Sequence, residues 1–363
     1  MLQELIRFIP VAEKIVPRNS TIEVLRNIAF KDGYVFATDL ELIAQMPVPE
    51  TRSFLIPFGI IKTVLKSKPA LLEFDLAEPN RIKINYDNKS VSFPRGEVAD
   101  YPNLPDTEFR PIGSWSKEAV MLLHSQLPYL SNDELRPALN GVYLNQNGSF
   151  SSCATDGHVL RVISDMDPAH QCELQEYSGI LPKRVLQLLP RLVKETVSVS
   201  FSEDYFRFEL KQGLTLYMRN IEGTYPDFAR VIPKEYASSV EVDVARLMNL
   251  TEAAKAFANR TTMASVFEID EDQLFIKVEN LEEDTRWESA MTVERISGGS
   301  LKVGMNLSYL EKVLDGIEGK TARWKYNDGD TASVFIDPDG NGGSAMNLIM
   351  PIRLAKEEED EDG

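Results

Sequence analysis

Asp156 and His158 are the residues of this sequence with the best potential for catalysis, because they stand two apart in the stretch "ATDGHVL", residues 154 to 160. A carboxylate beside an imidazole can transfer protons or hold a metal ion. The stretch "ATDLELI", residues 37 to 43, starts with the same three residues but has neither the glycine nor the histidine. Aspartate at a strand end commonly fixes a turn through the backbone that follows it. The repetition therefore favours a structural corner over an active site.

A hydrolase or a metalloenzyme is the rival class for this chain. Its three histidines, His124, His158 and His170, lack the metalloprotease spacing HExxH. The phosphate-binding pattern GxxxxGK and the nucleophile pattern GxSxG are also absent. Cys153 and Cys172 are too few for a disulfide scaffold and too far apart for a metal knuckle. We therefore expect no catalytic residue, no metal and no cofactor, and a reducing cytoplasm as the compartment.

The charge of the chain is unevenly distributed. Its 363 residues carry a net charge of −17, which by itself argues against binding to nucleic acid. The final "KEEEDEDG" combines Lys356 with six acids and contributes −5, which leaves −12 for the remainder. Acidic runs of this kind are usually disordered and solvated, with a specific binding role as the alternative. No apolar run approaches the roughly 20 residues of a membrane-spanning helix.

An internal repeat is the strongest organisational signal. Three segments each join a short apolar strand to an amphipathic helix, namely "LIPFGIIKTVLKS" (55–67), "ILPKRVLQLLPRL" (180–192) and "KVGMNLSYLEKVL" (302–314). Pro57 and Pro182 suit the first turn of a helix, and Asn306 suits the cap just before it. Their spacings of 125 and 124 residues are the size of a domain. We therefore predict three copies of one domain, 1–112, 113–237 and 238–354, followed by an acidic tail, 355–363.

The same order of elements is predicted in each copy. An amphipathic helix comes first, in "LQELIRFIPVAEKI", "SKEAVMLLHSQL" and "VARLMNLTEAAKAFA". Short strands follow, with hairpin signals at "KDGY" and "QNGS". Two more strands with alternating apolar residues come after the second helix. The predicted fold class is α+β, with two helices on one face of antiparallel strands in each domain.

Five stretches in register point to a family. They are "PRNSTIEVLRNI" (17–28) with the "ATDLE" that follows, "RPALNGVYL" (136–144), "ATDGHVL", "IEGTYPDFARVIP" (221–233) and "LIMPIRL" (348–354). In this order and spacing the chain resembles the bacterial DNA polymerase III beta subunit, the sliding clamp. The resemblance implies a head-to-tail dimeric ring of six domains, with the helices lining the hole. It also implies a non-catalytic homodimer that encircles double-stranded DNA without reading its sequence.

Helices that line such a ring should be positively charged. The helix "PFGIIKTVLKSK" and the helix "PKRVLQLLPRLVK" contain bases and no acid, whereas "NLSYLEKVLDGIE" has only Lys312 against three acids. An ordinary solvated helix face is the alternative explanation. The residues expected to face DNA are Arg7, Lys14, Arg18, Lys62, Lys66, Lys68, Lys117, Lys183, Arg184, Arg191, Lys194, Arg246, Lys255 and Arg260.

A hydrophobic pocket between the second and third domains is a further implication of the resemblance. It binds short linear motifs of the polymerase catalytic subunit, the clamp loader, and repair and translesion polymerases. Apolar walls would take leucine and phenylalanine of the peptide, and a few polar groups would fix its direction. Packing between domains is the alternative, above all for Leu139 and Val231. The expected pocket residues are Leu139, Thr155, Gly157, His158, Val159, Leu160, Pro226, Arg230, Val231, Leu348, Met350, Pro351, Ile352 and Arg353.

Some features depart from the family pattern. Val159 stands where the family commonly has arginine, and the chain begins later, which predicts a missing first strand. The acidic tail extends beyond the usual end, and we hypothesise that it competes electrostatically with acidic partner peptides or modulates them. The ring-closing contact is expected to pair the edge strand near Val91 and Phe93 with the partner's region around Phe257. A clamp-like scaffold that binds peptides without loading on DNA is the alternative function.

Overall fold

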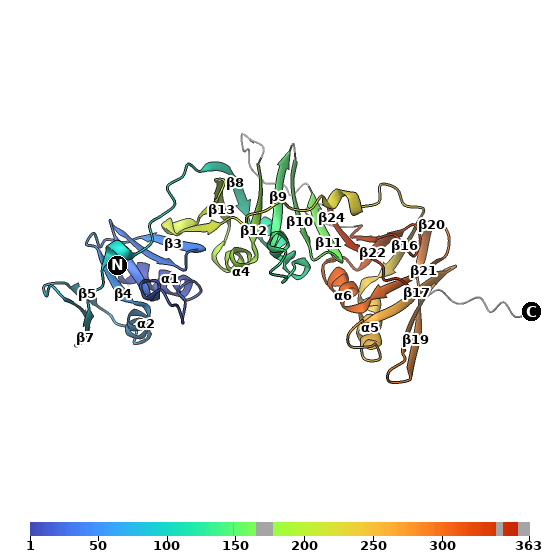
Figure 1. The fold of residues 1–363 in the computed structure, drawn as a ribbon, viewed down its shortest axis with the longest axis horizontal. Helices are drawn as coiled ribbons and strands as arrows, with labels where there is room; N and C mark the ends of the chain where they lie inside the picture. The colour runs from blue at the N-terminus through green and yellow to red at the C-terminus, as the bar shows by residue number, and fades with distance from the viewer. Residues whose placement is uncertain (148, 165–176, 339–343, 355–363) are drawn as a thin grey trace, which may run out of the picture. The chain divides into compact units, whose positions relative to one another are not determined.

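The computed structural model describes residues 1–147, 149–164, 177–338 and 344–354. Within these residues the chain forms six α-helices and four β-sheets, and all the strand pairings are antiparallel (Figure 1). The predicted α+β class is confirmed. The chain divides into two compact units, of which the first holds Met1–Lys117 and Leu188–Asn220 and the second holds most of the remainder.

The helices occupy the predicted places. Those in the described residues are α1 (Leu2–Ala12), α2 (Phe58–Lys66), α3 (Lys117–His124), α4 (Lys183–Leu192), α5 (Val244–Lys255) and α6 (Leu307–Asp315). Asn306 caps α6 as predicted, since its Oδ1 accepts hydrogen bonds from the amides of Ser308 and Tyr309 at 2.9 and 3.2 Å. Pro57 is itself the cap residue of α2, one position earlier than predicted, and Pro182 ends the strand before α4.

The first unit contains two sheets. Its larger sheet has eight strands in the order β4 (Phe54–Pro57), β1 (Asn27–Lys31), β2 (Tyr34–Thr38), β3 (Leu42–Pro47), β15 (Thr215–Arg219), β14 (Tyr205–Glu209), β13 (Thr196–Phe201) and β8 (Arg110–Ser116). The smaller sheet has the order β5 (Leu72–Asp75), β6 (Arg81–Tyr86) and β7 (Lys89–Pro94). Phe30 of β1, Phe54 of β4 and Phe74 of β5 pack ring to ring, with centroids 4.7 to 5.2 Å apart, and so join the two sheets.

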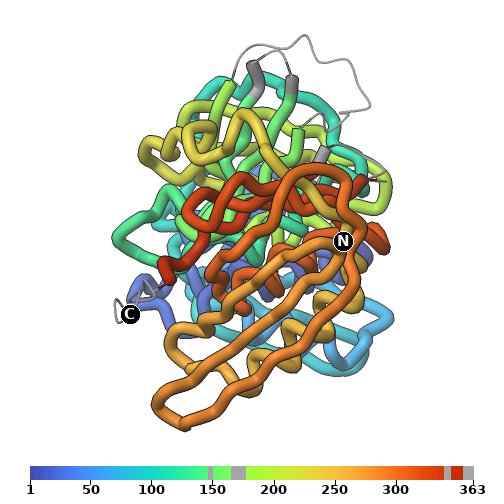
Figure 2. Tube along the Cα trace, turned by 90° about the vertical axis from the view of Figure 1, so that its right-hand side faces the viewer, coloured from blue at the N-terminus to red at the C-terminus, as the bar shows by residue number. Residues whose placement is uncertain are grey.

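The second unit also contains two sheets. Its larger sheet has the order β12 (Tyr177–Pro182), β9 (Gly141–Asn147), β10 (Ser149–Thr155), β11 (Val159–Ser164), β24 (Ser344–Ile349), β23 (Ser333–Ile336), β22 (Thr321–Tyr326), β16 (Ser238–Asp243) and β20 (Glu294–Ser297). The other sheet has the order β19 (Thr285–Thr292), β18 (Gln273–Asn280), β17 (Ala264–Asp270) and β21 (Leu301–Asn306). Figure 2 shows β17, β18 and β19 side by side, in orange, with α5 behind them. Helices α5 and α6 pack against each other.

The order of elements repeats along the chain. In the second and third repeats a strand, β8 or β16, precedes the first helix and pairs with the first strand after the second helix, β13 or β22. In the first repeat no strand precedes α1 in the described residues, and the corresponding sheet, β5-β6-β7, has three strands. The "KDGY" hairpin is confirmed, because Asp32 and Gly33 have φ of 53° and 82° between paired β1 and β2. The "QNGS" signal includes Gly148, which lies outside the described residues, although β9 and β10 do pair.

Candidate functional site

The stretch 155–159 forms a corner between β10 and β11. Asp156 Oδ1 accepts hydrogen bonds from the amides of His158 and Val159 at 2.9 and 3.0 Å. Thr155 Oγ1 accepts from the amide of Gly157 at 3.0 Å and donates to the carbonyl of Val159 at 2.6 Å. Gly157 has φ of +97°, which only glycine adopts without strain. The carboxylate and the hydroxyl therefore fix the backbone.

An equivalent corner lies between β2 and β3. Asp39 Oδ1 accepts from the amides of Glu41 and Leu42 at 3.1 and 2.9 Å, and Thr38 Oγ1 accepts from the amide of Leu40 at 3.0 Å. Leu40 takes the position of Gly157 and has φ of +84°. The sequence interpretation of "ATD" as a structural corner that the chain makes twice is confirmed.

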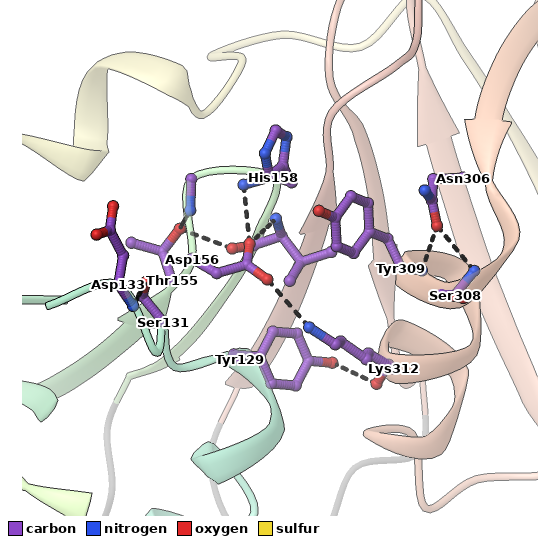
Figure 3. A network of polar contacts seen from close by, with 12 residues as sticks. Tyr129, Ser131, Asp133, Thr155, Asp156, His158, Asn306, Ser308, Tyr309 and Lys312 are labelled. Carbon is purple, nitrogen blue, oxygen red and sulfur yellow. Dashed lines mark hydrogen bonds and ion pairs between the residues drawn. The ribbon is translucent and has the colours of Figure 1, made fainter. Parts of the chain in front are cut away.

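The corner at residues 155–159, called the second corner because it lies in the second repeat, is tied to α6 by two further contacts, shown in Figure 3. Asp156 Oδ2 lies 3.0 Å from Lys312 Nζ, and the His158 ring stacks on the Tyr309 ring with centroids 5.0 Å apart. Lys312 Nζ also lies 5.2 Å from the centroid of the Tyr309 ring. The only base of α6, which the sequence showed as one base against three acids over 306–318, is thus bound to the corner.

A buried polar network lies next to this contact. The Tyr129 hydroxyl is 2.9 Å from the carbonyl of Lys312 (Figure 3). The same hydroxyl is 2.8 Å from Asn347 Oδ1. Arg161 Nη1 donates to the same Asn347 oxygen at 2.7 Å. Burial raises the pKa of Tyr129 above its ordinary value, so the phenol stays protonated. The network joins η3 (Leu127–Tyr129), β11, β24 and α6, and it gives the corner a fixed support.

A mainly apolar cavity of about 550 Å³ opens beside the corner. Its buried floor is formed by Leu139, Val159, Leu160 and Leu348, and Met350 follows at the end of β24. The amide of Met350 donates to the carbonyl of His158 at 2.9 Å, which holds the end of β24 against the corner. A cavity of this size and lining is suited to a few apolar side chains of a ligand.

Residues under the cavity are unsuited to nucleophilic chemistry. The Tyr225 hydroxyl donates to the carbonyl of Cys153 at 3.3 Å, and both side chains belong to the core beneath the cavity. Burial raises the pKa of the Cys153 thiol well above its usual range and does the same for Tyr225. The thiol is therefore held protonated and away from solvent, where it packs as a small apolar group.

Ten of the fourteen predicted pocket residues line this cavity. They are Leu139, Thr155, Gly157, His158, Val159, Leu160, Pro226, Val231, Leu348 and Met350. The other four lie outside the lining. Arg230 is exposed and paired with Asp227 at 2.8 Å, and Ile352 bonds through its amide to the carbonyl of Gly304. Pro351 and Arg353 flank Ile352 on that segment.

Several lining residues had not been predicted. They are Arg136, Pro137, Ala138, Glu222, Gly223, Thr224, Asp227 and Phe228. All stand inside or next to the motif strings that carried the resemblance, so the strings marked the right segments. Arg136 pairs with Asp133 at 2.9 Å. The hydrogen bond from this guanidinium is the main cause that lowers the pKa of the Asp133 carboxyl, and the hydrogen bond from the Leu135 amide is the second. The cavity therefore has a charged rim and an apolar floor.

The residues expected to face DNA lie mostly on exposed positions of the helices and the segments that follow them. Within the described residues, Lys62 is ion-paired with Glu13, and Lys255 is ion-paired with Glu311. Lys183 Nζ donates to Asn132 at 2.7 Å. Arg184 is partly buried, and the remaining members of the set, except Lys62 and Lys255, are exposed. Their contact with DNA stays a prediction.

The three residues expected at a subunit contact have different environments. Phe93 is only 4% exposed, so its side chain belongs to the core of its own unit, and Val91 on the same face of β7 is partly covered. Phe257 is 40% exposed and stacks on Trp287 of β19 with ring centroids 6.3 Å apart. Any contact through β7 must therefore use its backbone edge more than these side chains.

Two absences in the described part of the chain bear on other functions. No group of three or more histidine, cysteine, aspartate or glutamate side chains in that part of the chain is placed to hold a metal ion. No helix there is both long and apolar enough to cross a membrane. His170, Cys172 and the tail 355–363 lie outside the described residues, so the hypothesis about the tail stays a prediction.

Repeated α+β domains that share continuous antiparallel sheets define the sliding-clamp fold. The fold matches the crystal structure of the DNA polymerase III subunit beta from Pseudomonas aeruginosa with a TM-score of 0.86 and 22% identity, over 97% of this chain and 98% of that one. The beta subunit from Streptococcus pyogenes matches with a TM-score of 0.85 and 19% identity, over 97% and 99%.

Sequence comparisons give the family. Residues 128–227 match the model of the DNA polymerase III beta subunit central domain, and 229–353 match that of its C-terminal domain. The beta sliding clamp of Caulobacter vibrioides is 25% identical over 94% of this chain and 95% of that protein. The beta sliding clamp of Escherichia coli is 25% identical over 92% and 93%. The chain belongs to the bacterial DNA polymerase III beta subunit family, the beta sliding clamps.

Proposed function

We propose that this chain is the subunit of a ring that encircles duplex DNA and tethers polymerases to it, with no catalytic step of its own. One observation carries the ring. The third strand after the first helix of the first repeat, β3, pairs with the last strand of the second repeat, β15. The third strand after the first helix of the second repeat, β11, pairs with the last strand of the third repeat, β24. Both pairings between consecutive repeats are antiparallel and follow one rule, in which the third strand after the first helix of one repeat pairs with the last strand of the next.

The rule leaves two edges without a partner in their sheets. The third strand after the first helix of the third repeat, β19, is an edge of its sheet, and the last strand of the first repeat, β7, is an edge of the three-stranded sheet. Edge strands expose backbone donors and acceptors that can pair with another chain. By the same rule β19 of one chain pairs with β7 of a second, and two such pairings close a head-to-tail ring of six repeats.

Side chains beside β19 support a contact at that edge. Phe257 and Trp287 form a stacked and partly exposed aromatic pair there. Aromatic residues are enriched in the centres of protein interfaces. Phe275, with a similar exposed fraction of 38%, lies on β18 and gives a matched control. Phe257→Ala should raise the dimer dissociation constant about tenfold or more, whereas Phe275→Ala should leave it nearly unchanged.

Solution mass and topological loading test the ring. Sedimentation should give twice the 40.9 kDa of the chain at micromolar concentration. A clamp loaded on circular DNA should stay bound through a salt wash and slide off when the DNA is linearised. Loss of the protein from circular and linear DNA alike would exclude topological binding. Cytoplasmic localisation and DNA contact by the basic helix residues are parts of the same proposal.

The cavity beside the second corner is proposed to bind short linear motifs of the polymerase, the clamp loader and repair polymerases. Its apolar floor and charged rim suit a peptide whose leucine and phenylalanine enter while the backbone stays near the rim. The clamp of Pseudomonas aeruginosa, similar to this chain, has been crystallised bound to griselimycin. A short peptide with adjacent leucine and phenylalanine should bind to this cavity. The Leu160→Ala variant should lose this binding, and the matched first-repeat variant Ile43→Ala should keep it.

A peptide-binding scaffold that never loads on DNA is the second candidate. Acids pair with Lys62 of the first repeat and with Lys255 and Lys312 of the third. These ion pairs lower the net positive charge that the helices present. A scaffold of this kind would bind the peptide normally but leave circular DNA in the salt wash. The two candidates are thus separated by one loading experiment.

A further inference from the structure

The pairings β3–β15 and β11–β24 join consecutive repeats in the same way but bury different side chains at one equivalent place. In the first pairing Ala44 stands opposite Leu216, and both side chains are buried and apolar. In the second pairing Arg161 stands opposite Asn347, and both side chains are buried and polar. The two places correspond, because Ala44 and Arg161 each follow the threonine of their corner by six residues. Apolar side chains are thus sufficient to close such a pairing, and the polar pair needs another reason.

The burial of Arg161 is costly. Its side chain is only 2% exposed, and Nη1 donates to Asn347 Oδ1 at 2.7 Å and to the carbonyl of Gly316. Both acceptors are neutral, so within the described residues the guanidinium is buried without an ion pair. Taking such a charge out of water costs free energy that hydrogen bonds offset only in part, and apolar side chains of similar volume often give equal or higher stability. The arginine is therefore better explained by what it holds in place than by a gain in stability.

Arg161 holds the C-terminal end of α6. Gly316 is the C-cap residue of that helix, and the side chains of Arg161, Tyr129 and Asn347 converge on it. A Cβ at residue 316 would stand 2.5 Å from Arg161 Nη1 and 2.6 Å from the Tyr129 hydroxyl. The glycine has φ of −78°, which any residue adopts, so the closeness of these side chains is what requires a glycine. The Tyr129 hydroxyl also donates to the carbonyl of Lys312, in the last turn of the same helix.

Helix α6 in turn reaches the cavity beside the second corner. Tyr309 lies about two turns before Gly316 on α6 and stacks on His158, which lines the cavity (Figure 3). Leu160 and Leu348, the sequence neighbours of the polar pair, stand opposite each other and form part of the cavity floor. Because a helix moves as a rigid body, a shift of its C-terminal end changes how the Tyr309 ring meets the His158 wall.

We propose that Arg161, together with Asn347 and Tyr129, is a positioning group for the peptide site. It fixes α6 against β11 and β24, so that the His158 wall is in place before a ligand arrives. This inference rests on the proposed binding of short linear motifs in the cavity. A wall that is already in place lowers the ordering cost of binding, so loss of the network should weaken peptide affinity more than it weakens the fold.

A double variant with Arg161→Met and Asn347→Leu tests the proposal, because it gives the second pairing an apolar pair of similar volume. Its melting temperature should be kept or raised, since a buried charge is removed. Its affinity for the leucine–phenylalanine peptide, measured by calorimetry, should fall about tenfold or more. Wild-type affinity in this folded variant would overturn the proposal.

Gly316→Ala disturbs the same network from the helix side and remains informative if the double variant does not fold. Alanine normally stabilises a helical position relative to glycine, so any loss comes from the contacts of the added Cβ. Gly59→Ala in α2 is the matched control, because nothing lies within 4 Å of a Cβ at that position. Gly316→Ala should lower the peptide affinity about tenfold and Gly59→Ala should leave it unchanged. Equal affinities in these two variants would contradict the proposal.

Proton NMR of the His158 ring, without peptide, separates this inference from the proposed function. The Tyr309 ring shields the ring stacked on it, so the His158 signals should lie upfield in the wild type. His158→Gln assigns these signals, and Tyr309→Leu gives their unshielded position. The double variant and Gly316→Ala should both move the signals toward that position. Unmoved signals would overturn the positioning role, whereas moved signals with no peptide binding by the wild type would support that role and contradict the proposed peptide site.

Discussion

The corner at Thr38-Asp39-Leu40 and the corner at Thr155-Asp156-Gly157 have the same backbone hydrogen bonds and different surroundings. In both, the aspartate accepts from the two amides that follow the turn residue. The second corner adds His158 stacked on Tyr309, and its aspartate contacts Lys312 of α6. The shared part is a way to turn the chain between two strands. At the corner that also contacts α6, Thr155 and Gly157 of this shared turn line the cavity together with His158. The same motif therefore serves as a structural turn in the first and second repeats, and in the second repeat it also lines a cavity.

Alanine substitutions of Leu160 and Ile43 should give the largest difference between the two corners, which is a difference in peptide binding. Each pairs with the threonine of its corner, Thr155 or Thr38, and each is buried. Either change to alanine should lower the free energy of unfolding by about 2–4 kcal/mol, because a buried aliphatic side chain is lost. Only Leu160→Ala should abolish binding of the leucine–phenylalanine peptide, measured by calorimetry. Loss of peptide binding in Ile43→Ala as well would mean that the cavity responds to general destabilisation.

Asp156 can be divided into its two functions. Asp156→Ala removes the oxygen that accepts from both amides and also removes the Lys312 contact, and should cost about 2–3 kcal/mol of unfolding free energy in urea denaturation. Asp156→Asn keeps the acceptor oxygen and loses the charge, and should cost about 1 kcal/mol. Equal losses in the two variants would show that the ion pair, and not the turn, is what the carboxylate contributes.

The turn residues of the two corners can be exchanged. Leu40 carries a positive φ that glycine adopts freely, so Leu40→Gly should raise the free energy of unfolding by about 0.5–1 kcal/mol. Gly157→Leu should lower it by about 1–2 kcal/mol, and its Cβ would stand only 3.3 Å from Arg136 Nη1. Thermal melting of both variants measures the pair, and a gain in both would contradict the equivalence of the corners.

The smallest expected difference is in how stability depends on pH. It involves Asp133, which pairs with Arg136 at the rim of the cavity. The Arg136 guanidinium, with the Leu135 amide, lowers the pKa of Asp133 below its usual value of 3.8. This contribution to stability is therefore complete above about pH 4 and is lost as the pH falls through the lower, folded-state pKa. Asp133→Asn should be slightly less stable than the wild type at pH 7, with the difference vanishing in the most acidic samples. A difference that grows on acidification would give the opposite sign of the pKa shift.

Local signals in the sequence predicted much of this fold. The helix positions, the Asn306 cap, the "KDGY" hairpin and the repeated corner all depend on residues within one turn or one helix of each other. The segments that line the cavity were also predicted, by the motif stretches that carried the family resemblance. Pro57 was placed one residue too far into its helix, since it is the cap residue of α2, where its backbone is still extended with ψ of 123°.

Long-range pairings could not be predicted in the same way. Alternation of apolar residues marks β3 and β15 as strands but does not say that Gln45 pairs with Thr215. The partner of Lys312 was hidden for the same reason, since Asp156 is 156 residues away in the chain. Phe93, expected at a subunit contact, is buried in its own unit, because a strand pattern gives the period of its side chains but not which face meets the core.

The strand pairing β11–β24 also bears on how the protein can be cut into pieces. A fragment that stops after residue 237 keeps β11 but loses β24, and so exposes the backbone of a strand that lies in the middle of its sheet. A fragment that ends before β15 does the same to β3. Unprotected strand edges of this kind promote aggregation. Expression of single repeats therefore calls for an added covering strand or a charged edge, and insoluble fragments are the expected outcome without one.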